Sequence, residues 1–202
     1  MKLYYSPGAC SLASHIVAQE AGIKLDLAKV NLGTKKTDSG ADFVAINAKG
    51  YVPALTLDDG SLLTEGTAIV QYLADLKPGA KLAPANGTFE RYRLQSLLGY
   101  INSELHKSYG PLFNPAISAE AKAERHAYLQ KRYAYIEKEL QGKSYLTGES
   151  FSIADAYLFT VTNWAAKLHV DLSAFPNLTG FQKRVAARPA VVAAMTAEGL
   201  IK

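Results

Sequence analysis

The sequence predicts a small α/β domain over residues 1–80, followed by an all-helical domain over residues 81–202. Within the first eighty residues the hydrophobic period changes repeatedly, which is typical of mixed strands and helices. The segment from Lys77 to Pro84 contains two prolines, so it should stop a helix and serve as a linker. Beyond this linker the apolar residues recur at helical spacing, and almost the whole segment is predicted to be helical.

The elements of the first part follow in the order strand, helix, strand, connector, strand, strand, helix. Gly22 should end the first helix, because glycine readily adopts the left-handed conformation of a helix cap. The last two strands flank Asp58-Asp59-Gly60, a strong hairpin signal, since Asp-Gly supplies the positive φ angles that tight turns need. The expected elements are strands at Leu3–Tyr5, Leu25–Leu32, Ala54–Leu57 and Ser61–Thr64, helices at Ser11–Ala21 and Glu65–Leu76, and a connector at Lys35–Lys49 with room for one short helix.

Two patterns locate helices in the second part. Leu129, Tyr133, Ile136 and Leu140 recur at helical spacing in a helix that should end at Gly142. Ser152-Ile-Ala-Asp155 has the form of a capping box, in which a serine and an acidic residue satisfy the first backbone N–H groups of a helix. The helix that it starts should carry an apolar face made of Leu158, Val161 and Ala165.

Composition and charge exclude several classes of protein. The 202 residues have a net charge of +4, too small a surplus to indicate binding to nucleic acid. With Cys10 as the only cysteine, an intramolecular disulfide is impossible, so we expect a reducing compartment, the cytoplasm. No apolar run is long enough to suggest a membrane span or membrane partner. Nor does any motif predict a metal ion or a bound nucleotide.

Cys10 is the first candidate for chemistry. A lone cysteine is more often a small buried apolar residue. However, this one directly precedes a predicted helix, whose unpaired N–H groups and dipole favour a negative charge, so the thiol should ionise more easily. A thiol after a Pro-Gly turn at the start of a helix is the arrangement of thioredoxin-like redox domains. The usual second thiol is absent, since Pro7 and Ala13 occupy the positions three residues away. A resolving thiol must therefore be external, and glutathione is the abundant candidate.

Val52-Pro53 and Glu65-Gly66 are candidates for binding a peptide-like ligand. A cis bond before Pro53 would turn Val52 outward, so that its N–H and C=O could pair with an extended ligand. From sequence alone the trans form is favoured, because few X–Pro bonds are cis. Glu65-Gly66 opens a predicted helix, where backbone N–H groups could bind a carboxylate while the Glu65 side chain takes an ammonium. An ordinary acidic first turn is the simpler alternative.

His106 stands apart from the other histidines. Ser103, His106 and Lys107 are spaced i, i+3 and i+4 on the first helix after the linker, so they share one polar face. A solvated surface is the simpler alternative. His15, by contrast, follows Cys10 by five positions, which places it about 140° away around the helix and makes action on the sulfur improbable.

Five short motifs occur in order along the chain. They are Pro7-Gly-Ala-Cys10-Ser11, Gly50-Tyr-Val52-Pro53-Ala-Leu, Leu63-Thr-Glu65-Gly66, Ser103-Glu104-Leu-His106-Lys107 and Phe151-Ser-Ile-Ala-Asp155-Ala-Tyr. Together they resemble the glutathione transferases, specifically the bacterial beta class, over essentially the whole chain. The resemblance implies a thioredoxin-like N-terminal domain, an all-helical C-terminal domain, a homodimer and a cis bond before Pro53.

The resemblance also implies roles for individual residues. Cys10 would face the glutathione sulfur and could form a mixed disulfide with it, and His106 would be a nearby polar or proton-transfer partner. The class often has asparagine where this chain has Gly99, so a hydrogen bond to the ligand should be missing and binding should be weaker. The other implied glutathione contacts are Val52 to the cysteinyl backbone, Glu65 and Gly66 to the γ-glutamyl end, Lys35 and Lys107 as positive charges, and Ser103 with Glu104 completing the site, Glu104 across the dimer interface.

The resemblance implies conjugation of reduced glutathione, as co-substrate with no permanently bound cofactor, to small hydrophobic electrophiles. Tyr109, Tyr157 and Trp164 are candidates for the apolar surface that binds the electrophile, although aromatic residues at such positions are as often core. A second hypothesis is glutathione-dependent redox chemistry at Cys10, either thiol–disulfide exchange or peroxide reduction. A third is a non-catalytic binding module, against which the intact set of site residues argues.

Overall fold

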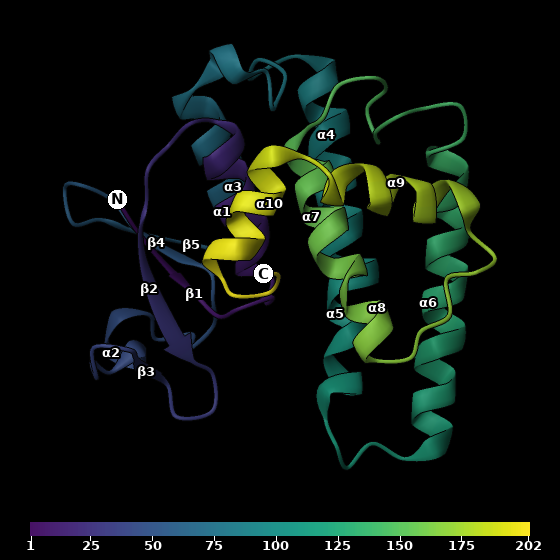
Figure 1. Ribbon diagram of the computed structural model, residues 1–202, viewed down its shortest axis with the longest axis horizontal. Helices are drawn as coiled ribbons and strands as arrows, with labels where there is room; N and C mark the ends of the chain where they lie inside the picture. The colour runs from purple at the N-terminus through teal and green to yellow at the C-terminus, as the bar shows by residue number, and fades with distance from the viewer. The chain divides into compact units, whose positions relative to one another are not determined.

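A computed structural model describes residues 1–202, and its contacts divide the chain into two compact units. The first unit contains Met1–Ala83 and Ala187–Lys202, and the second contains Pro84–Ala186. The first unit combines a sheet with helices, and the second is helical (Figure 1). This architecture confirms the predicted fold class.

The first unit is built on a five-stranded sheet with the order β3-β2-β1-β4-β5. Its strands are β1 (Lys2–Tyr5), β2 (Asp26–Asn31), β3 (Lys36–Thr37), β4 (Ala54–Thr56) and β5 (Leu62–Thr64). The central strand β1 runs parallel to β2 and antiparallel to β4. Strands β4 and β5 form the hairpin that the Asp-Gly turn predicts, with Leu55 opposite Leu63.

Four α-helices belong to this unit: α1 (Ser11–Glu20), α2 (Phe43–Ile46), α3 (Gly66–Leu76) and α10 (Pro189–Ala197). A single 3₁₀ turn, η1 (Pro78–Ala80), follows α3. Every residue of α1 from Ser11 to Ala18 is buried, because α1 contacts α3, α10 and β1. The expected single apolar face is therefore too narrow a description of α1.

The last residues of the chain differ from the expected division. Residues 187–202 belong to the first unit, and α10 lies beside α1 (Figure 1). Three polar contacts hold it there: His15 Nδ1 lies 3.1 Å from Glu198 Oε1, the Gly8 N–H donates to Glu198 Oε2, and Arg188 donates to both carboxylate oxygens of Glu20. The proline-containing linker predicted the domain boundary and placed all later residues in the second domain. Sequence reasoning therefore missed the return of the chain to the first unit.

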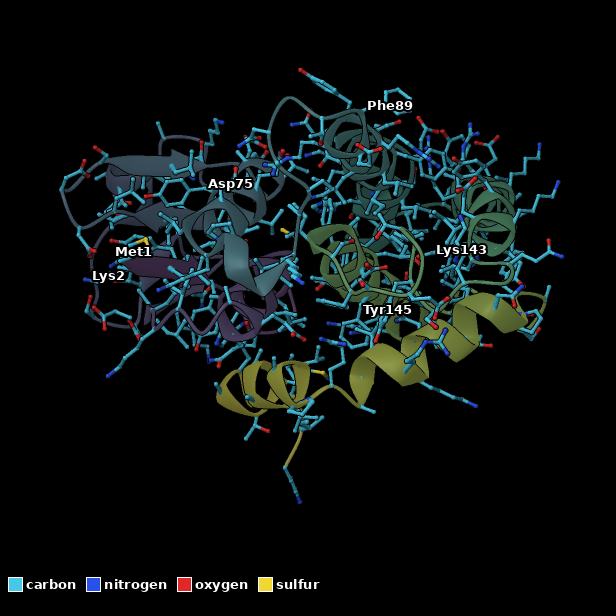
Figure 2. The ribbon with its side chains drawn as sticks, turned by 90° about the horizontal axis from the view of Figure 1, so that it is seen from above. Met1, Lys2, Asp75, Phe89, Lys143 and Tyr145 are labelled. Carbon is cyan, nitrogen blue, oxygen red and sulfur yellow. The ribbon has the colours of Figure 1, made fainter.

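The second unit consists of helical segments joined by short loops. They are α4 (Phe89–Tyr100), the π-helical segment η2 (Ile101–His106), α5 (Lys107–Tyr109), the 3₁₀ segment η3 (Gly110–Phe113), α6 (Ala119–Glu139), α7 (Ile153–Thr162), α8 (Trp164–Lys167) and α9 (Pro176–Ala186). Phe89, which is labelled in Figure 2, begins α4. Its exposed fraction is 72%. No helix of the structure is long and apolar enough to cross a bilayer.

Helix α7 forms the core of the second unit and is buried along its whole length. The predicted capping box is present, with Asp155 Oδ2 accepting from the Ser152 N–H at 2.8 Å. Asp155 Oδ1 also accepts from the Leu146 N–H. Burial nevertheless raises the pKa of Asp155 to about 6, because desolvation of the carboxylate outweighs these hydrogen bonds. The helix predicted to run through Ala165 is divided, and α8 begins at Trp164.

Candidate functional site

Cys10 lies at the N-cap of α1 in the first unit, as predicted. Its side chain is half-buried, and its Sγ lies 3.1 Å from the carbonyl oxygen of Val52. The start of the helix directs backbone N–H groups and a positive dipole end toward this position, which favours a negative charge. The thiol and the expected peptide-binding backbone therefore lie in direct contact.

The loop before Cys10 is fixed by two contacts. Ser11 is fully buried, and its hydroxyl bonds both the N–H and the carbonyl of Ser6, at 3.2 and 3.3 Å. Gly8 has φ 68° and donates its N–H to Glu198 Oε2 at 2.9 Å. Since the Ser11 hydroxyl is committed to Ser6, its position favours a structural role for this residue.

The peptide bond between Val52 and Pro53 is cis. This confirms the implication of the resemblance and overturns the preference for trans that sequence alone gave. Val52 is 7% exposed and packs in a cluster with Tyr4, Val30 and Phe43, which anchors the segment just before β4. The reason for the error is that the cis form depends on surroundings contributed by distant parts of the chain.

Glu65 and Gly66 form the start of α3, close to the same proline. A Cβ atom added to Gly66 would lie 3.6 Å from Pro53 Cγ, so the first turn of α3 packs against Pro53. Glu65 has φ 71° and its carboxylate pairs with Lys49 Nζ at 2.6 Å. Lys49 was missed by sequence reasoning, because nothing in its local sequence distinguishes it from a solvated lysine.

Lys35 lies beside the segment that leads to Val52. Its φ is 56°, and its ammonium donates to the Gly50 carbonyl at 3.0 Å while lying 5.9 Å from the centre of the Tyr51 ring. The positive charge that the resemblance implies is thus held near the predicted peptide-binding edge of the first unit.

In the second unit, the π-helical segment and the start of α5 carry the predicted polar residues. Ser103 donates to the Gly99 carbonyl at 3.0 Å, and Lys107 is exposed. Glu104 accepts from the Tyr128 hydroxyl at 2.6 Å and pairs with Arg132 Nε at 2.9 Å. The Glu104 carboxylate is therefore oriented by residues of α6.

Gly99 lies in an open part of α4. A Cβ atom added there would meet no atom within 4 Å, and the backbone conformation is not one that requires glycine. An asparagine side chain would fit at position 99, so packing does not require glycine there.

His106 lies at the end of the π-helical segment and is held by Tyr157 from α7. His106 Nδ1 is 2.6 Å from the Tyr157 hydroxyl, which in turn donates to Asn102 Oδ1 at 2.9 Å. The rings of Trp164 and Tyr157 lie edge-on to the imidazole, with centroids 5.0 and 5.8 Å away. Sequence reasoning missed Asn102, although its spacing of four residues from His106 would place it on the same helix face.

The three aromatic candidates for substrate contact have different surroundings. Tyr109 is fully buried, and its hydroxyl pairs with that of Tyr133 at 2.8 Å. This burial raises the pKa of Tyr109 and favours the core alternative that the sequence left open. Tyr157 contacts His106, whereas Trp164 is half-buried and lies 5.5 Å, between ring centres, from the more exposed Phe113.

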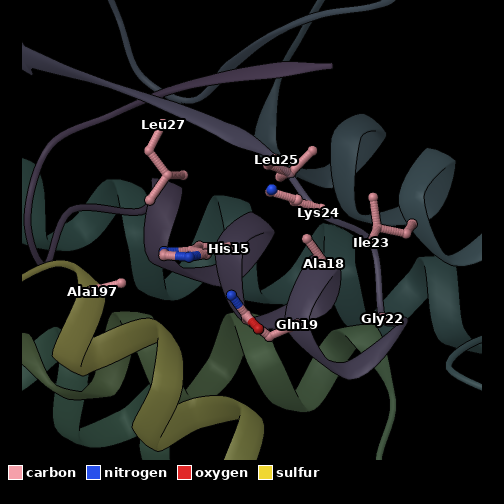
Figure 3. A pocket seen from close by; sticks show the side chains of 9 residues that line it. All are labelled: His15, Ala18, Gln19, Gly22, Ile23, Lys24, Leu25, Leu27 and Ala197. Atoms are coloured by element: carbon pink, nitrogen blue, oxygen red, sulfur yellow. The ribbon is translucent and has the colours of Figure 1, made fainter.

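A separate cavity of about 330 Å³ lies along α1, toward the end of the helix that is remote from Cys10 (Figure 3). Its walls combine apolar side chains with the imidazole of His15, the amide of Gln19 and the ammonium of Lys24. The remaining lining residues are Ala18, Gly22, Ile23, Leu25, Leu27 and Ala197. No residue implied to bind glutathione lines this cavity.

Comparison with known proteins gives a consistent result for both parts of the chain. Residues 8–76 match the family described as Glutathione S-transferase, N-terminal domain, and residues 100–189 match Glutathione S-transferase, C-terminal domain. The chain is 46% identical to Glutathione S-transferase GstA of Escherichia coli O157:H7, over 99% of this chain and 100% of that protein.

Two solved structures are similar over their whole length. A bacterial beta class glutathione S-transferase from Sphingomonas chungbukensis is 50% identical, with a TM-score of 0.96 and full coverage of both chains. A sphingomonad glutathione S-transferase solved in complex with glutathione is 48% identical, with a TM-score of 0.95 and full coverage of both chains.

Proposed function

The chain belongs to the glutathione S-transferase family, in its bacterial beta class, and on this premise we propose that it conjugates reduced glutathione to small hydrophobic electrophiles. In this reaction the glutathione sulfur attacks an electrophilic carbon, a carbon–sulfur bond forms, and the leaving group departs while the thiol proton passes to a basic group of the site and from there to solvent. Conjugation of this kind makes reactive apolar compounds more polar, as in detoxification.

One observation supports the proposal most strongly. Cys10 Sγ, the Val52 carbonyl, cis-Pro53 and the first turn of α3 at Gly66 are contiguous in the first unit. A backbone strip pairs with an extended peptide, and a helix start accepts a carboxylate. Glutathione offers both features, and a sphingomonad relative has been solved with it bound.

We assign the remaining residues to the parts of glutathione that they would contact. We assign Val52 to the cysteinyl backbone, and Glu65 with Gly66 to the γ-glutamyl end. Lys35 supplies positive charge toward the ligand. In the second unit the corresponding assignments are Ser103, Glu104 and Lys107 as polar and charged contacts, Gly99 as the position of a missing contact, and His106 as the proton-transfer partner.

A second function is supported by Cys10 itself. The thiol is half-buried, is the only cysteine of the chain, and lies at a helix start. With glutathione disulfide as oxidant, the Cys10 thiolate attacks one sulfur, so that Cys10–S–S–glutathione forms and one glutathione thiolate leaves. We propose that this exchange accompanies conjugation in the reducing cytoplasm, where glutathione keeps thiols reduced.

The deciding experiment compares the wild type with Cys10→Ala. Turnover of 1-chloro-2,4-dinitrobenzene with glutathione measures conjugation, and mass spectrometry after exposure to glutathione disulfide detects the glutathionyl adduct. We expect the adduct only in the wild type, because the variant has no thiol.

The two readouts separate the two functions. Conjugation lost in Cys10→Ala makes the thiol part of the transfer itself. Conjugation retained assigns Cys10 to redox chemistry and leaves other groups, among them His106, to activate glutathione. Absence of conjugation in the wild type, with any of several chloronitrobenzenes, would contradict the transferase proposal.

We also propose that the protein is a homodimer. Phe89 and Tyr92 are spaced i, i+3 on α4 and are 72% and 59% exposed, so they present aromatic surface suited to a partner. Phe89→Asp combined with Tyr92→Asp should halve the mass measured by light scattering, since a charge in an apolar interface must be desolvated. Val192→Asp changes an exposed apolar residue on α10 and should leave the mass unchanged. A monomeric wild type would refute the proposal.

A further inference from the structure

Tyr157, on α7, joins Asn102 and His106 of the π-helical segment into a chain of hydrogen bonds. We propose that Tyr157 and Asn102 are positioning residues that hold the imidazole of His106 in its Nδ1–H tautomer. The catalytic use of this tautomer rests on the proposed function, in which His106 transfers a proton, but the tautomer itself is a property of the protein alone.

The proton count of the three side chains fixes which group donates and which accepts in each hydrogen bond. Asn102 Oδ1 can only accept, so the bond of 2.9 Å requires the Tyr157 hydroxyl to donate. A tyrosine hydroxyl has one proton, and toward His106 its oxygen can therefore only accept. The bond of 2.6 Å to Nδ1 then places a proton on Nδ1. In the neutral ring, Nε2 carries the lone pair.

The residues around these hydrogen bonds restrict other arrangements of the Tyr157 hydroxyl and the His106 ring. Tyr157 is 3% exposed, so few water molecules can replace either partner of its hydroxyl. The ring of Trp164 lies edge-on to the imidazole with centroids 5.0 Å apart, which limits rotation of His106 about its side-chain bonds. A rotated imidazole would lose both the hydroxyl and the aromatic contact.

The tautomer decides which nitrogen can act as a base. Histidine in water prefers the Nε2–H form, in which the basic nitrogen is Nδ1. The arrangement in this protein reverses that preference and makes Nε2 the basic nitrogen of the ring. Orientation of a catalytic histidine by a hydrogen-bonded neighbour is a general way to assign one ring nitrogen to the substrate.

The test is ¹⁵N NMR of the ligand-free protein labelled at the histidine rings, at a pH at which imidazoles are neutral. The chain has four histidines, and His106→Asn assigns the signals of His106. We expect the wild type to give a protonated Nδ1 and an unprotonated Nε2. Tyr157→Phe removes the acceptor of the Nδ1 proton, so the Nε2–H signal should grow.

Two substitutions of Asn102 test the hydrogen bonds from Asn102 through Tyr157 to His106 without changing the packing of the Tyr157 ring. Asn102→Leu frees the tyrosine proton to bond Nδ1, and should therefore shift His106 to the Nε2–H form. Asn102→Asp keeps an acceptor for Tyr157 and should restore the Nδ1–H form. Tyr100→Phe is the matched control, because it removes a hydroxyl bonded to the Arg132 carbonyl elsewhere in the same unit, and the His106 signals should not move.

Outcomes of the NMR experiment are decisive. A wild type in the Nε2–H form, or Nδ1–H retained in both Tyr157→Phe and Asn102→Leu, would overturn the assignment. Near-ultraviolet circular dichroism confirms that each variant is folded. Because no substrate is present, this result does not depend on which reaction the protein catalyses.

Kinetics then test the use of the tautomer. Tyr157→Phe and Asn102→Leu should each lower kcat by about tenfold, which is part of the rate that a general base contributes. Asn102→Asp should have most of the wild-type rate. In a His106→Asn background neither change should lower kcat further. If His106→Asn itself retains full turnover, the proton-transfer role in the proposed function fails, whereas the tautomer measured by NMR stands.

Discussion

The two units place their candidate groups in different ways. In the first unit the groups include backbone atoms, the Val52 carbonyl and the first turn of α3 at Gly66, which contacts between distant segments bring together with the Cys10 thiol. In the second unit they are side chains, Ser103, His106 and Lys107, arranged by the spacing of one continuous helical stretch. The first set comes together only through tertiary contacts, whereas the second lies along one stretch of sequence, in which residues of α6 and α7 then orient Glu104 and His106.

This difference indicates how each region should respond to mutation. A group on the backbone cannot be removed by changing its own side chain, so the sensitive positions are the residues that hold the backbone in place. A group on a helix face can be removed, or added, directly. Three predictions test this contrast, in order of decreasing expected effect.

Glu198 should have the largest effect, because one buried carboxylate holds the loop before Cys10. It accepts from the Gly8 N–H at 2.9 Å and contacts His15 Nδ1 at 3.1 Å, with no exposed side-chain surface. Glu198→Ala leaves both groups without a buried acceptor, so the free energy of unfolding should fall by about 3–5 kcal/mol. Urea denaturation measures this loss, and glutathione KM should rise with it.

Glu198→Gln is the matched variant, since its amide oxygen can still accept from one of the two donors. We expect an intermediate loss of stability. If Glu198→Ala is as stable as the wild type, long-range contacts do not hold this loop and the contrast between the units fails.

Asp155 tests the second unit, where the hydrogen bonds to this carboxylate at the start of α7 come from within nine residues along the chain. Its pKa is raised from 3.8 to about 6, so the folded state binds the proton more tightly than the unfolded state. The contribution of this group to stability is therefore full below pH about 4 and is lost as the pH rises through about 6, a change of about 3 kcal/mol.

The wild type should lose about 3 kcal/mol of stability through Asp155 between pH 4 and pH 7. In Asp155→Asn the side chain cannot titrate, so this loss should be absent. The variant should also lose stability at both pH values, because its amide nitrogen cannot accept from Ser152. Urea denaturation at constant protein concentration gives both quantities. Parallel pH profiles of the two proteins would show that burial does not perturb Asp155.

Gly99→Asn should have the smallest effect, and it adds a group instead of removing one. The added side chain has open space and a permissive backbone, and asparagine is a better helix residue than glycine by a few tenths of a kcal/mol. One new hydrogen bond to glutathione, at about 0.5–1.5 kcal/mol, should lower its dissociation constant by about two- to tenfold, measured by calorimetry. Gly99→Ala adds the helix stability without the hydrogen bond. An unchanged or raised dissociation constant for the asparagine variant would contradict the prediction.

Sequence patterns predicted most elements of the fold, because their signals are local. The Asp-Gly turn gave the β4–β5 hairpin, and the Ser152–Asp155 pattern gave the cap of α7. In the second unit the i, i+3, i+4 spacing indicated the polar stretch at His106. Each of these inferences needs only residues that are neighbours along the chain.

The remaining features depend on contacts that no local pattern records. The pairing of Lys49 with Glu65, the cis bond before Pro53 and the hydrogen bond from Gly8 to Glu198 each require the folded structure. The cis bond was implied only by resemblance to a family, which carries tertiary information that a single sequence lacks. The roles assigned to individual residues remain predictions until the variants are measured.

The return of α10 to the first unit has a consequence for synthesis on the ribosome. Residues 1–83 emerge first, but α1 then lacks the helix that covers it and the carboxylate that bonds Gly8. The second unit emerges as one uninterrupted segment and could complete its fold before residues 187–202 are made. The loop that carries Cys10 would thus reach its final shape only after residues 187–202 have been translated.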